Sequence, residues 1–532
     1  MPYLSAYVGI ILLTAPMLVM IGAWLPLDIS NEFTYFFSSG LIADYALNSI
    51  IITLGTTAAS IIIGVFLAWC VTMVAFPGRT VVAWLLLLPL AVPSFIAAMI
   101  YGDVFDSSGI VQQSIRHYMD LAYGEYYFPA MRSTSGVIFV LTMTLYPYVY
   151  MAVRAAFLMQ SQQMLETAQL LGINDKAMLW RVMIPMARPV IVAGAAIVAM
   201  EALADYGVAS LFGVPVLTTG IFRAWQGYYD PITATRLASL LFICVLSCVA
   251  IERMTRKGAQ YHNMTALYHP LALVRYGSFA QWLICGLCIL ILFLGIIFPV
   301  IILAFWAFKS ATLSVQDVIL SASSSAFIGI CVALLCLIGS LFFAYFQRYY
   351  ATSKMKALSI VALHGYALPG AVIAVGVLVV CIALQRVMFN GAPYLTASVA
   401  AVIWGCTVRF ITVSYNNVNA SLQNVTPAMD DAGVMLGHSR SSVMRYVHIP
   451  IIKGALYTAF LLVFIDTVKE LPATLLLRPY NMNTLAIKSF ELAKDDMLYD
   501  AAPLALILIA LSACPVMLVA GKYQRSRPGN IS

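Results

Sequence analysis

Long apolar stretches follow one another along almost the whole of this 532-residue chain. Most run for about 20 residues or longer, and only 10% of the residues are charged against 62% hydrophobic. A bilayer core admits only helices and closed barrels, because backbone polar groups find no water there. Stretches of about 20 residues, rather than alternation over about ten, favour helices over barrel strands. The sequence therefore predicts an all-α, polytopic membrane protein.

Twelve transmembrane helices are predicted, six on either side of a polar segment at 253–277. We interpret 1–252 as a first six-span half, 253–277 as a cytoplasmic linker and 278–532 as a second half. The approximate predicted spans are 4–25, 47–75, 81–102, 136–158, 189–210, 233–252, 279–307, 325–346, 357–384, 396–415, 453–475 and 500–521.

The distribution of basic residues predicts the orientation. Most of the 29 Lys and Arg residues fall in cytoplasmic segments if the N-terminus lies inside. This positive-inside bias predicts that both termini are cytoplasmic. The net charge of +7 follows from this topology, and a nucleic-acid partner is not expected because the basic residues are scattered over separate loops. The predicted cytoplasmic segments are 79, 154–188, 253–275, 348–356, 409–453 and the C-terminal tail.

A polar motif occurs twice, at an interval of 265 residues. In each copy an acid and a glycine are six positions apart, and the glycine and a proline are thirteen apart. A second correspondence, at an interval of 276, links Ala91-Val92-Pro93-Ser94 with Ala367-Leu368-Pro369-Gly370. The two halves therefore have the same direction and form parallel repeats. The motif residues are Glu166, Thr167, Ala168, Gly172, Ile184 and Pro185 in the first copy, and Asp431, Ala432, Gly433, Gly437, Ile449 and Pro450 in the second.

Each copy, within loops 163–188 and 421–453, predicts two short helices joined at the glycine and ended by the proline. Apolar residues on a cytoplasmic loop are typical of a helix that inserts into a groove on another protein. An ordinary connecting loop with capping residues is the alternative, and two identically spaced copies argue against it. The apolar residues of the second copy are Met435, Leu436, Val443, Met444 and Val447.

Four acids lie within predicted spans, again at the 265-residue interval. Glu201 and Asp205 are four positions apart and share a helix face, as do Asp466 and Glu470. An acid in a span costs at least a few kcal/mol, so these side chains should face the bundle interior or a water-filled path. They are candidates for the translocation pathway and, as oxygen ligands, suit a hard cation. The alternative is structural pairing, for example of Glu470 with Lys469 or a backbone group; no defined metal site is predicted, since tight ligation would stall transport.

The paired loops resemble the "EAA" loop of importer-type ABC transporter permeases. Glu166 stands at the acidic position, with Thr167 and Ala168 where two alanines are usual; the second copy has Asp431 for Glu and Gly433 for the second Ala. The resemblance implies a type I ABC importer-like fold in a bacterial inner (cytoplasmic) membrane. It also implies that the two loops couple the chain to two copies of a separate ATPase subunit, which bind the ATP and Mg.

Two further stretches resemble fused permeases of the ferric-iron uptake class. One runs from Glu201 through Ser210 to Pro215, and the other from Asp466 through Thr474 to Pro479. This resemblance implies ferric iron as cargo and a periplasmic substrate-binding protein as a further partner. No catalytic residue is implied, and the chain contains no G-x-x-x-x-G-K-[ST] phosphate loop, as expected if ATP is hydrolysed on another polypeptide.

Other functions remain open at this point. The same mechanism could serve thiamine, a polyamine, phosphonate or another small solute. An ion-coupled secondary transporter also has parallel repeats, but it offers no reason for two matched glycine-centred loops. An intramembrane enzyme is not favoured, because no span contains an H-E-x-x-H or G-x-S-x-G motif.

Overall fold

A computed structural model gives the course of almost the whole chain. Regular structure in its described part is helical, apart from one isolated parallel bridge between Val74 and Val274. The described residues are 2–24, 31–122, 124–159, 170, 175–256, 274, 276–310, 313–350, 352, 358–359, 362–363, 365, 368–392, 394–396 and 398–525.

Ten helices in these residues are long and apolar enough to cross a membrane, and a bent pair makes eleven if it counts as one span. The all-helical, multi-span prediction is confirmed. The predicted third span, 81–102, is the bent pair, broken into Arg79–Ala91 and Ser94–Val104 at an angle of 90°. The last predicted span, 500–521, lies in α25 (Leu498–Arg525), of which Leu498–Ala513 is an apolar helical stretch. The number twelve remains a prediction.

Pro93 causes the bend in the third span. Proline fixes its own φ and disfavours helical backbone in the preceding residue. Accordingly Val92 is extended (φ −88°, ψ 112°) between η1 (Leu88–Ala91) and α5 (Ser94–Val104). A proline of similar conformation, Pro369 (φ −58°, ψ 140°), directly precedes α18 (Gly370–Met388). The starts of α5 and α18 reproduce the 276-residue interval of the sequence repeat.

The 265-residue repeat is also present in the helices. Each copy consists of a π-helical turn, a helix of 21 residues, a break at an acid and a short helix. The long helices begin and end at the same interval, which extends the repeat from sequence to structure. The elements are η2 (Leu179–Met183), α10 (Ile184–Ala204) and α11 (Gly207–Leu211), and η6 (Met444–His448), α22 (Ile449–Lys469) and α23 (Pro472–Leu477).

The prediction that Pro185 and Pro450 end a helix is wrong. Each lies in the first turn of a long helix that continues from the π turn before it. In the π turn the amide of Ile184 donates to the carbonyl of Leu179, five residues back. This wider turn accommodates a proline ring, which has no amide hydrogen and would clash with a carbonyl in a regular helix.

Contacts divide the chain into two compact units. Unit 1 comprises Met1–Gly40, Gly220–Phe242 and Ala311–Leu492; unit 2 comprises Leu41–Thr219, Ile243–Ser310 and Ala493–Ser532. Within the described residues, three helices pass from one unit to the other: α12 (Leu217–Phe222), α13 (Pro231–Arg256) and α24 (Leu485–Lys494).

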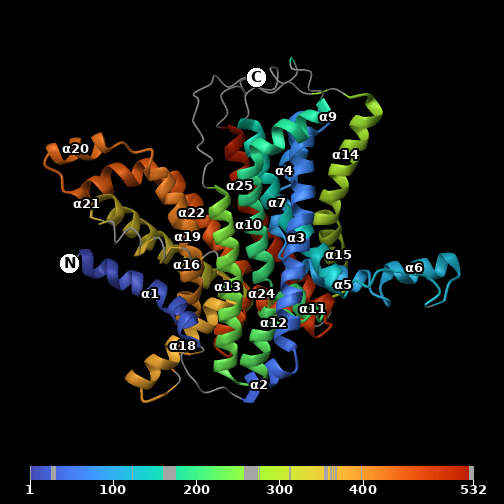
Figure 1. The fold of residues 1–532 in the computed structure, drawn as a ribbon, viewed down its shortest axis with the longest axis horizontal. Coiled ribbons are helices and arrows are strands. Elements are labelled where there is room, and N and C mark those ends of the chain that lie inside the picture. The colour runs from blue at the N-terminus through green and yellow to red at the C-terminus, as the bar shows by residue number, and fades with distance from the viewer. Residues whose placement is uncertain are drawn as a thin grey trace. The chain divides into compact units, whose positions relative to one another are not determined.

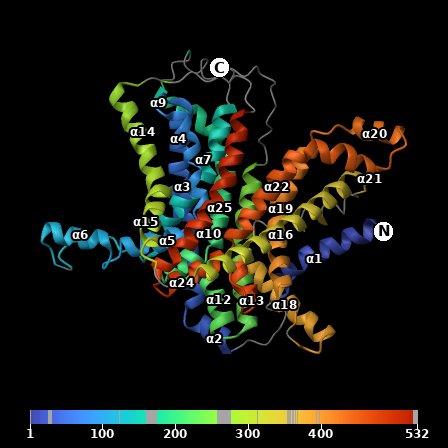
Figure 2. The ribbon, with the colours of Figure 1, turned by 180° about the vertical axis from the view of Figure 1, so that it is seen from behind.

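Unit 2 is built on α3 (Leu41–Met73), α7 (Thr134–Met159) and α10, which run side by side (Figures 1 and 2). The helices approach closely where a side chain is missing: a Cβ on Gly64 would lie 2.8 Å from Val149 Cβ. Small residues serve this purpose between membrane helices. The other elements of unit 2 are α4 (Arg79–Leu85), α6 (Ile110–Met119), α9 (Asp175–Met178), α14 (Ser278–Leu292), η4 (Phe293–Ile297) and α15 (Phe298–Ala307).

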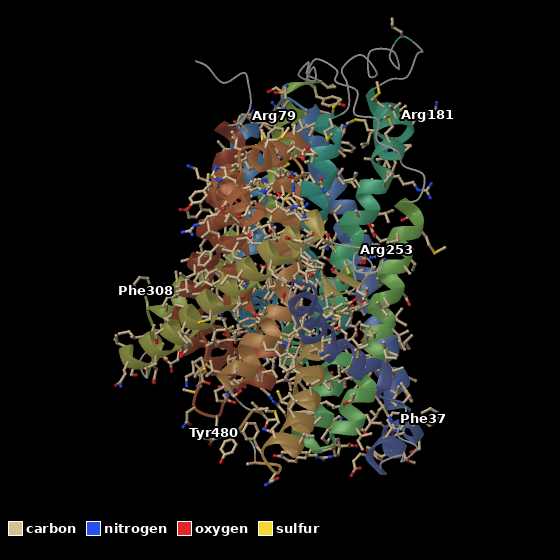
Figure 3. All side chains as sticks on the ribbon, turned by 90° about the vertical axis from the view of Figure 1, so that its left-hand side faces the viewer. Phe37, Arg79, Arg181, Arg253, Phe308 and Tyr480 are labelled. Carbon is tan, nitrogen blue, oxygen red and sulfur yellow. The ribbon has the colours of Figure 1, made fainter. Side chains whose placement is uncertain are left out.

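Two basic residues lie near the same end of unit 2 (Figure 3). Arg79 begins α4, and Arg181 belongs to η2. Their two segments were assigned to the same membrane side on the basis of charge. Their position at one end of unit 2 agrees with the assignment to one membrane side. That this side is the cytoplasmic one remains a prediction.

Unit 1 is built on the counterpart bundle of α16 (Val315–Tyr349), α19 (Val399–Leu422) and α22. A Cβ on Gly329 of α16 would lie 2.8 Å from Phe464 of α22, so this packing also depends on a small residue. The bundle leads to α20 and α21 at one end (Figure 2). The other elements of unit 1 are α1 (Pro2–Gly22), α2 (Asn31–Ser38), η3 (Arg223–Gly227), α20 (Pro427–Met435), α21 (Arg440–Val443) and most of α24 (Leu485–Lys494).

The first span of each sequence half packs in the unit built mainly from the other half. The first, α1, packs on α18, and Trp404 Nε1 donates a hydrogen bond to the carbonyl of Leu12 over 3.0 Å. The seventh, α14 to α15, packs in unit 2, where Tyr101 donates to the carbonyl of Leu294. Sequence halves and packing units are therefore different divisions of the chain.

Candidate functional site

The second polar loop has the predicted form of two short helices joined at a glycine. Gly437 links α20 to α21 with φ +80°, a conformation that favours glycine. Position 433 requires a glycine for a different reason: a Cβ there would lie 2.5 Å from Val443 Cγ2. Gly433, which stands where the EAA motif usually has its second alanine, therefore lets α20 pack directly on α21.

The apolar residues of this loop divide into two groups. Met435 and Leu436, at the end of α20, are 89% and 79% exposed. Val443 and Met444 are buried, so the expectation that they form part of the exposed apolar surface is wrong. Val443 lies under α20 instead. The end of α20 and the turn that follows it are thus part of the apolar surface available to another protein.

Most of the first loop lies outside the described residues. Glu166, Thr167, Ala168 and Gly172 are among those that are not described, so their role remains a prediction. Ile184 is half-buried and Pro185 exposed at the start of α10. Trp180, in the π turn before it, is 71% exposed and is an apolar side chain that a partner could contact.

Two adjacent acids in the second loop have different surroundings. Asp431, with Ala432 beside it, is exposed and has no hydrogen bond or ion pair within the described chain. Asp430 is half-buried and contacts Arg348, Tyr349 and His448. Burial by itself would raise the pKa of Asp430, but these three neighbours outweigh it and hold the pKa below its ordinary value.

The helix break after α10 is held by neutral donors. Asp205 accepts hydrogen bonds from Ser94 Oγ at 2.5 Å and from the amide of Val208 at 2.9 Å. Its own carbonyl accepts from Thr218 Oγ1 at 2.7 Å. The carboxylate therefore caps α11, where helix amides lack partners within the helix.

The break after α22 is held by an ion pair. Glu470 Oε2 lies 2.5 Å from Arg409 Nη1, with both side chains buried. The other oxygen of Glu470 accepts from the amide of Ala473 at 2.9 Å and so caps α23. A Cβ on Gly370 would clash with both Glu470 and Arg409, so the glycine leaves room for the pair.

The remaining two acids lie one turn earlier on the long helices. Asp466 is half-exposed and pairs with Lys469 over 3.5 Å. Glu201 is half-buried in α10. Of the four candidate pathway acids, Asp205 and Glu470 thus have a structural capping role, as the alternative interpretation proposed. Whether any of the four contacts cargo remains a prediction.

No three His, Cys, Asp or Glu side chains in the described residues form a group that could hold a metal ion. Glu201 and Asp205 belong to unit 2, and Asp466 and Glu470 to unit 1. The convergence of the two pairs around one axis therefore remains a prediction.

Sequence reasoning missed the partners of the acids. Arg409 was assigned to a cytoplasmic segment starting at that residue, but it lies within α19, a candidate span that continues to Leu422. A single arginine in an apolar run was the available signal, because buried charge needs a partner. Ser94 was noted only as part of the repeat, and its pairing with Asp205 depends on the bend at Pro93.

Comparison with known proteins relates part of this chain to a class of transport proteins. Residues 60–257 match the family described as "Binding-protein-dependent transport system inner membrane component". Over these residues the chain is similar to inner-membrane permeases of the binding-protein-dependent ABC importer type, which are transport subunits. In such systems ATP binding belongs to a partner ATPase, and a binding protein delivers the substrate.

The relatives are named for the transport of different solutes. The chain is 26% identical to the Fe(3+)-transport system permease protein FbpB 2 of Haemophilus influenzae, over 90% of this chain and 89% of the relative. It is 25% identical to the putative 2-aminoethylphosphonate transport system permease protein PhnV of Salmonella typhimurium, over 36% and 71%. It is 28% identical to the sulfate transport system permease protein CysW of Escherichia coli, over 31% and 53%.

Proposed function

We propose that this chain supplies both halves of the pore of an importer that moves ferric iron into the cell. One observation carries the cargo assignment: the similarity to the Fe(3+) permease extends along 90% of the chain, whereas the matches to phosphonate and sulfate permeases cover about a third. Carboxylate oxygens at both helix breaks suit a hard cation, although both are also engaged in capping.

The two polar loops are the proposed docking sites of two ATPase copies. The second loop presents Met435 and Leu436 to solvent at the turn around Gly437. The matched elements α10 and α22 continue directly from the two loops, so closure of the ATPase subunits would move these helices. A periplasmic binding protein would deliver the cargo at the opposite face, and both termini would be cytoplasmic.

Reconstitution tests this proposal. The chain would be placed in liposomes with candidate ATPase and exported binding-protein partners from its source organism, and uptake of radiolabelled ferric iron would be measured. We expect accumulation that requires ATP, the ATPase and the binding protein. Parallel vesicles would receive thiamine, a polyamine, 2-aminoethylphosphonate or sulfate.

The possible outcomes separate the alternatives. ATP-dependent uptake of another solute in place of iron would retain the mechanism and refute the cargo. Uptake driven by an ion gradient without the ATPase would indicate a secondary transporter and refute the mechanism. Replacing Gly172 and Gly437 by bulky residues should lower cargo-stimulated ATP hydrolysis without removing the chain from the membrane.

A further inference from the structure

Asp430 is held by three side chains from two other helical elements. Arg348 Nε, near the end of α16, lies 2.7 Å from Asp430 Oδ2. The hydroxyl of Tyr349, the last residue of α16, donates to Asp430 Oδ1 over 2.8 Å. His448 Nε2, in η6, lies 2.7 Å from the same oxygen, and the histidine is fully buried. We call these four residues the Asp430 cluster.

The end of α16 also contacts the segments on either side of α20. Arg348 donates to the carbonyls of Leu422 and Val425, at 3.1 and 2.9 Å, where α19 ends. The carbonyl of Leu422 also accepts from the amide of Val425 at 3.1 Å, so the guanidinium binds the turn that ends α19 while it binds Asp430. In addition, the hydroxyls of Tyr345 and Ser441 are 3.3 Å apart, which connects α16 to α21. The loop is thus attached to α16 before, within and after α20.

The matched positions of the first half do not have the residues of such a cluster. Helices α16 and α3 end 276 positions apart, and the two loops are 265 apart. These intervals place Thr72 and Met73 opposite Arg348 and Tyr349, and Leu165 and Met183 opposite Asp430 and His448. None of these four side chains carries a charge. Thr72 Oγ1 bonds within its own helix, to the carbonyl of Ala68 at 2.7 Å.

We propose that Asp430 is a positioning residue that fixes the second loop to α16. Movement imposed on this loop is then delivered to two spans, α16 through the cluster and α22 through the helix that continues from η6. The four matched positions of the first half carry no charged side chain, so the two halves do not respond equally to their ATPase subunits. This inference rests on the proposed function of the loops as ATPase docking sites.

The exposed neighbour of Asp430 provides a matched control. Asp430→Asn removes one charge from the cluster, whereas Asp431→Asn removes one charge from the solvent-exposed face of the same helix. Asp430→Glu retains the carboxylate. Tyr349→Phe removes a single hydrogen bond and serves if Asp430→Asn does not accumulate in the membrane.

The first measurement needs neither cargo nor partner. Amide hydrogen exchange of the purified chain in lipid nanodiscs reports local opening of residues 427–443. We expect about tenfold faster exchange there in Asp430→Asn, a smaller increase in Tyr349→Phe, and wild-type exchange in Asp431→Asn. Unchanged exchange in Asp430→Asn, or the same increase in Asp431→Asn, would overturn the positioning role.

The second measurement is the amount of cargo moved per ATP hydrolysed by the complete complex in liposomes. For Asp430→Asn we expect ATPase subunits to remain bound and this ratio to fall about threefold or more, with recovery in Asp430→Glu. For Asp431→Asn, hydrolysis and uptake should fall together at a constant ratio. Loss of ATPase binding in Asp430→Asn would instead make Asp430 a docking residue. Absence of ATP-dependent transport by the wild type would refute the proposed function, while the exchange result would still stand.

Discussion

The two helix breaks after α10 and α22 share a backbone plan but differ in chemistry. In each, an acid follows a 21-residue helix and caps a short one. Asp205 is held by the hydroxyl of Ser94, whereas Glu470 is held by the guanidinium of Arg409. A 265-residue interval from Arg409 leads to Thr144, which has no charge.

The difference teaches that a repeated backbone can be stabilised by unequal side chains. At the first break Ser94 begins α5, and the matching residue of α18 is Gly370. The glycine makes room for Arg409, which replaces the hydroxyl as donor. The substitutions at these matched positions are therefore coupled within each half, and four experiments can break or sharpen this comparison.

The largest effect is expected for Arg409→Met. This change leaves Glu470 buried without its cation, which typically costs about 3–5 kcal/mol. The free energy of unfolding, measured by SDS titration in mixed micelles, should fall by that order. Adding Glu470→Gln should recover part of the loss, because the remaining group is then neutral. A loss below about 1 kcal/mol for the single variant would show that the pair is not needed.

Gly370→Ser places at the second break the serine that Ser94 supplies at the first break. Its Cβ would clash with Glu470 and Arg409, and overpacking of this kind costs about 1–3 kcal/mol. The same SDS titration measures the loss. Gly370→Ser combined with Arg409→Met should be less destabilising than the sum of the two, whereas additive losses would argue against coupled positions.

Ser94→Ala should have a smaller effect. It removes one hydrogen bond to a charged acceptor, and Asp205 retains the amide of Val208. Bonds of this type contribute about 1.5–3 kcal/mol. We expect a loss toward the lower end by the same titration, clearly below that of Arg409→Met. Equal losses of unfolding free energy in Ser94→Ala and Arg409→Met would show that the neutral hydrogen bond and the ion pair stabilise the two breaks equally.

The smallest effect on stability is expected in the second loop. Gly437→Ala places a side chain at φ +80°, where L-residues cost about 1–2 kcal/mol. Because the loop is exposed, the loss should appear mainly as faster local hydrogen exchange. Gly454→Ala is the control, since this glycine lies within α22 with open space around it. Similar behaviour of the two variants would show that the turn tolerates a side chain.

Much of the candidate site could be predicted from periodicity and spacing. The intervals of 265 and 276 anticipated the matched bounds of α10 and α22 and the matched starts of α5 and α18. Gly437 was correctly predicted as the turn of the second loop. The proline effect was misjudged, because whether a proline ends a helix or follows a π turn depends on local hydrogen bonding that the spacing does not reveal.

The sequence by itself determined the helical, multi-span class, the duplication and the positions of the four acids, because the bilayer restricts backbone structure and the repeat preserves spacing. Only the tertiary structure decided which side chain each acid contacts and which unit each span joins. Partners such as Arg409 with Glu470 and Arg348 with Asp430 are 61 and 82 positions apart. Such pairs form only when separate helices pack, and packing depends on shape at each contact rather than on spacing along the chain.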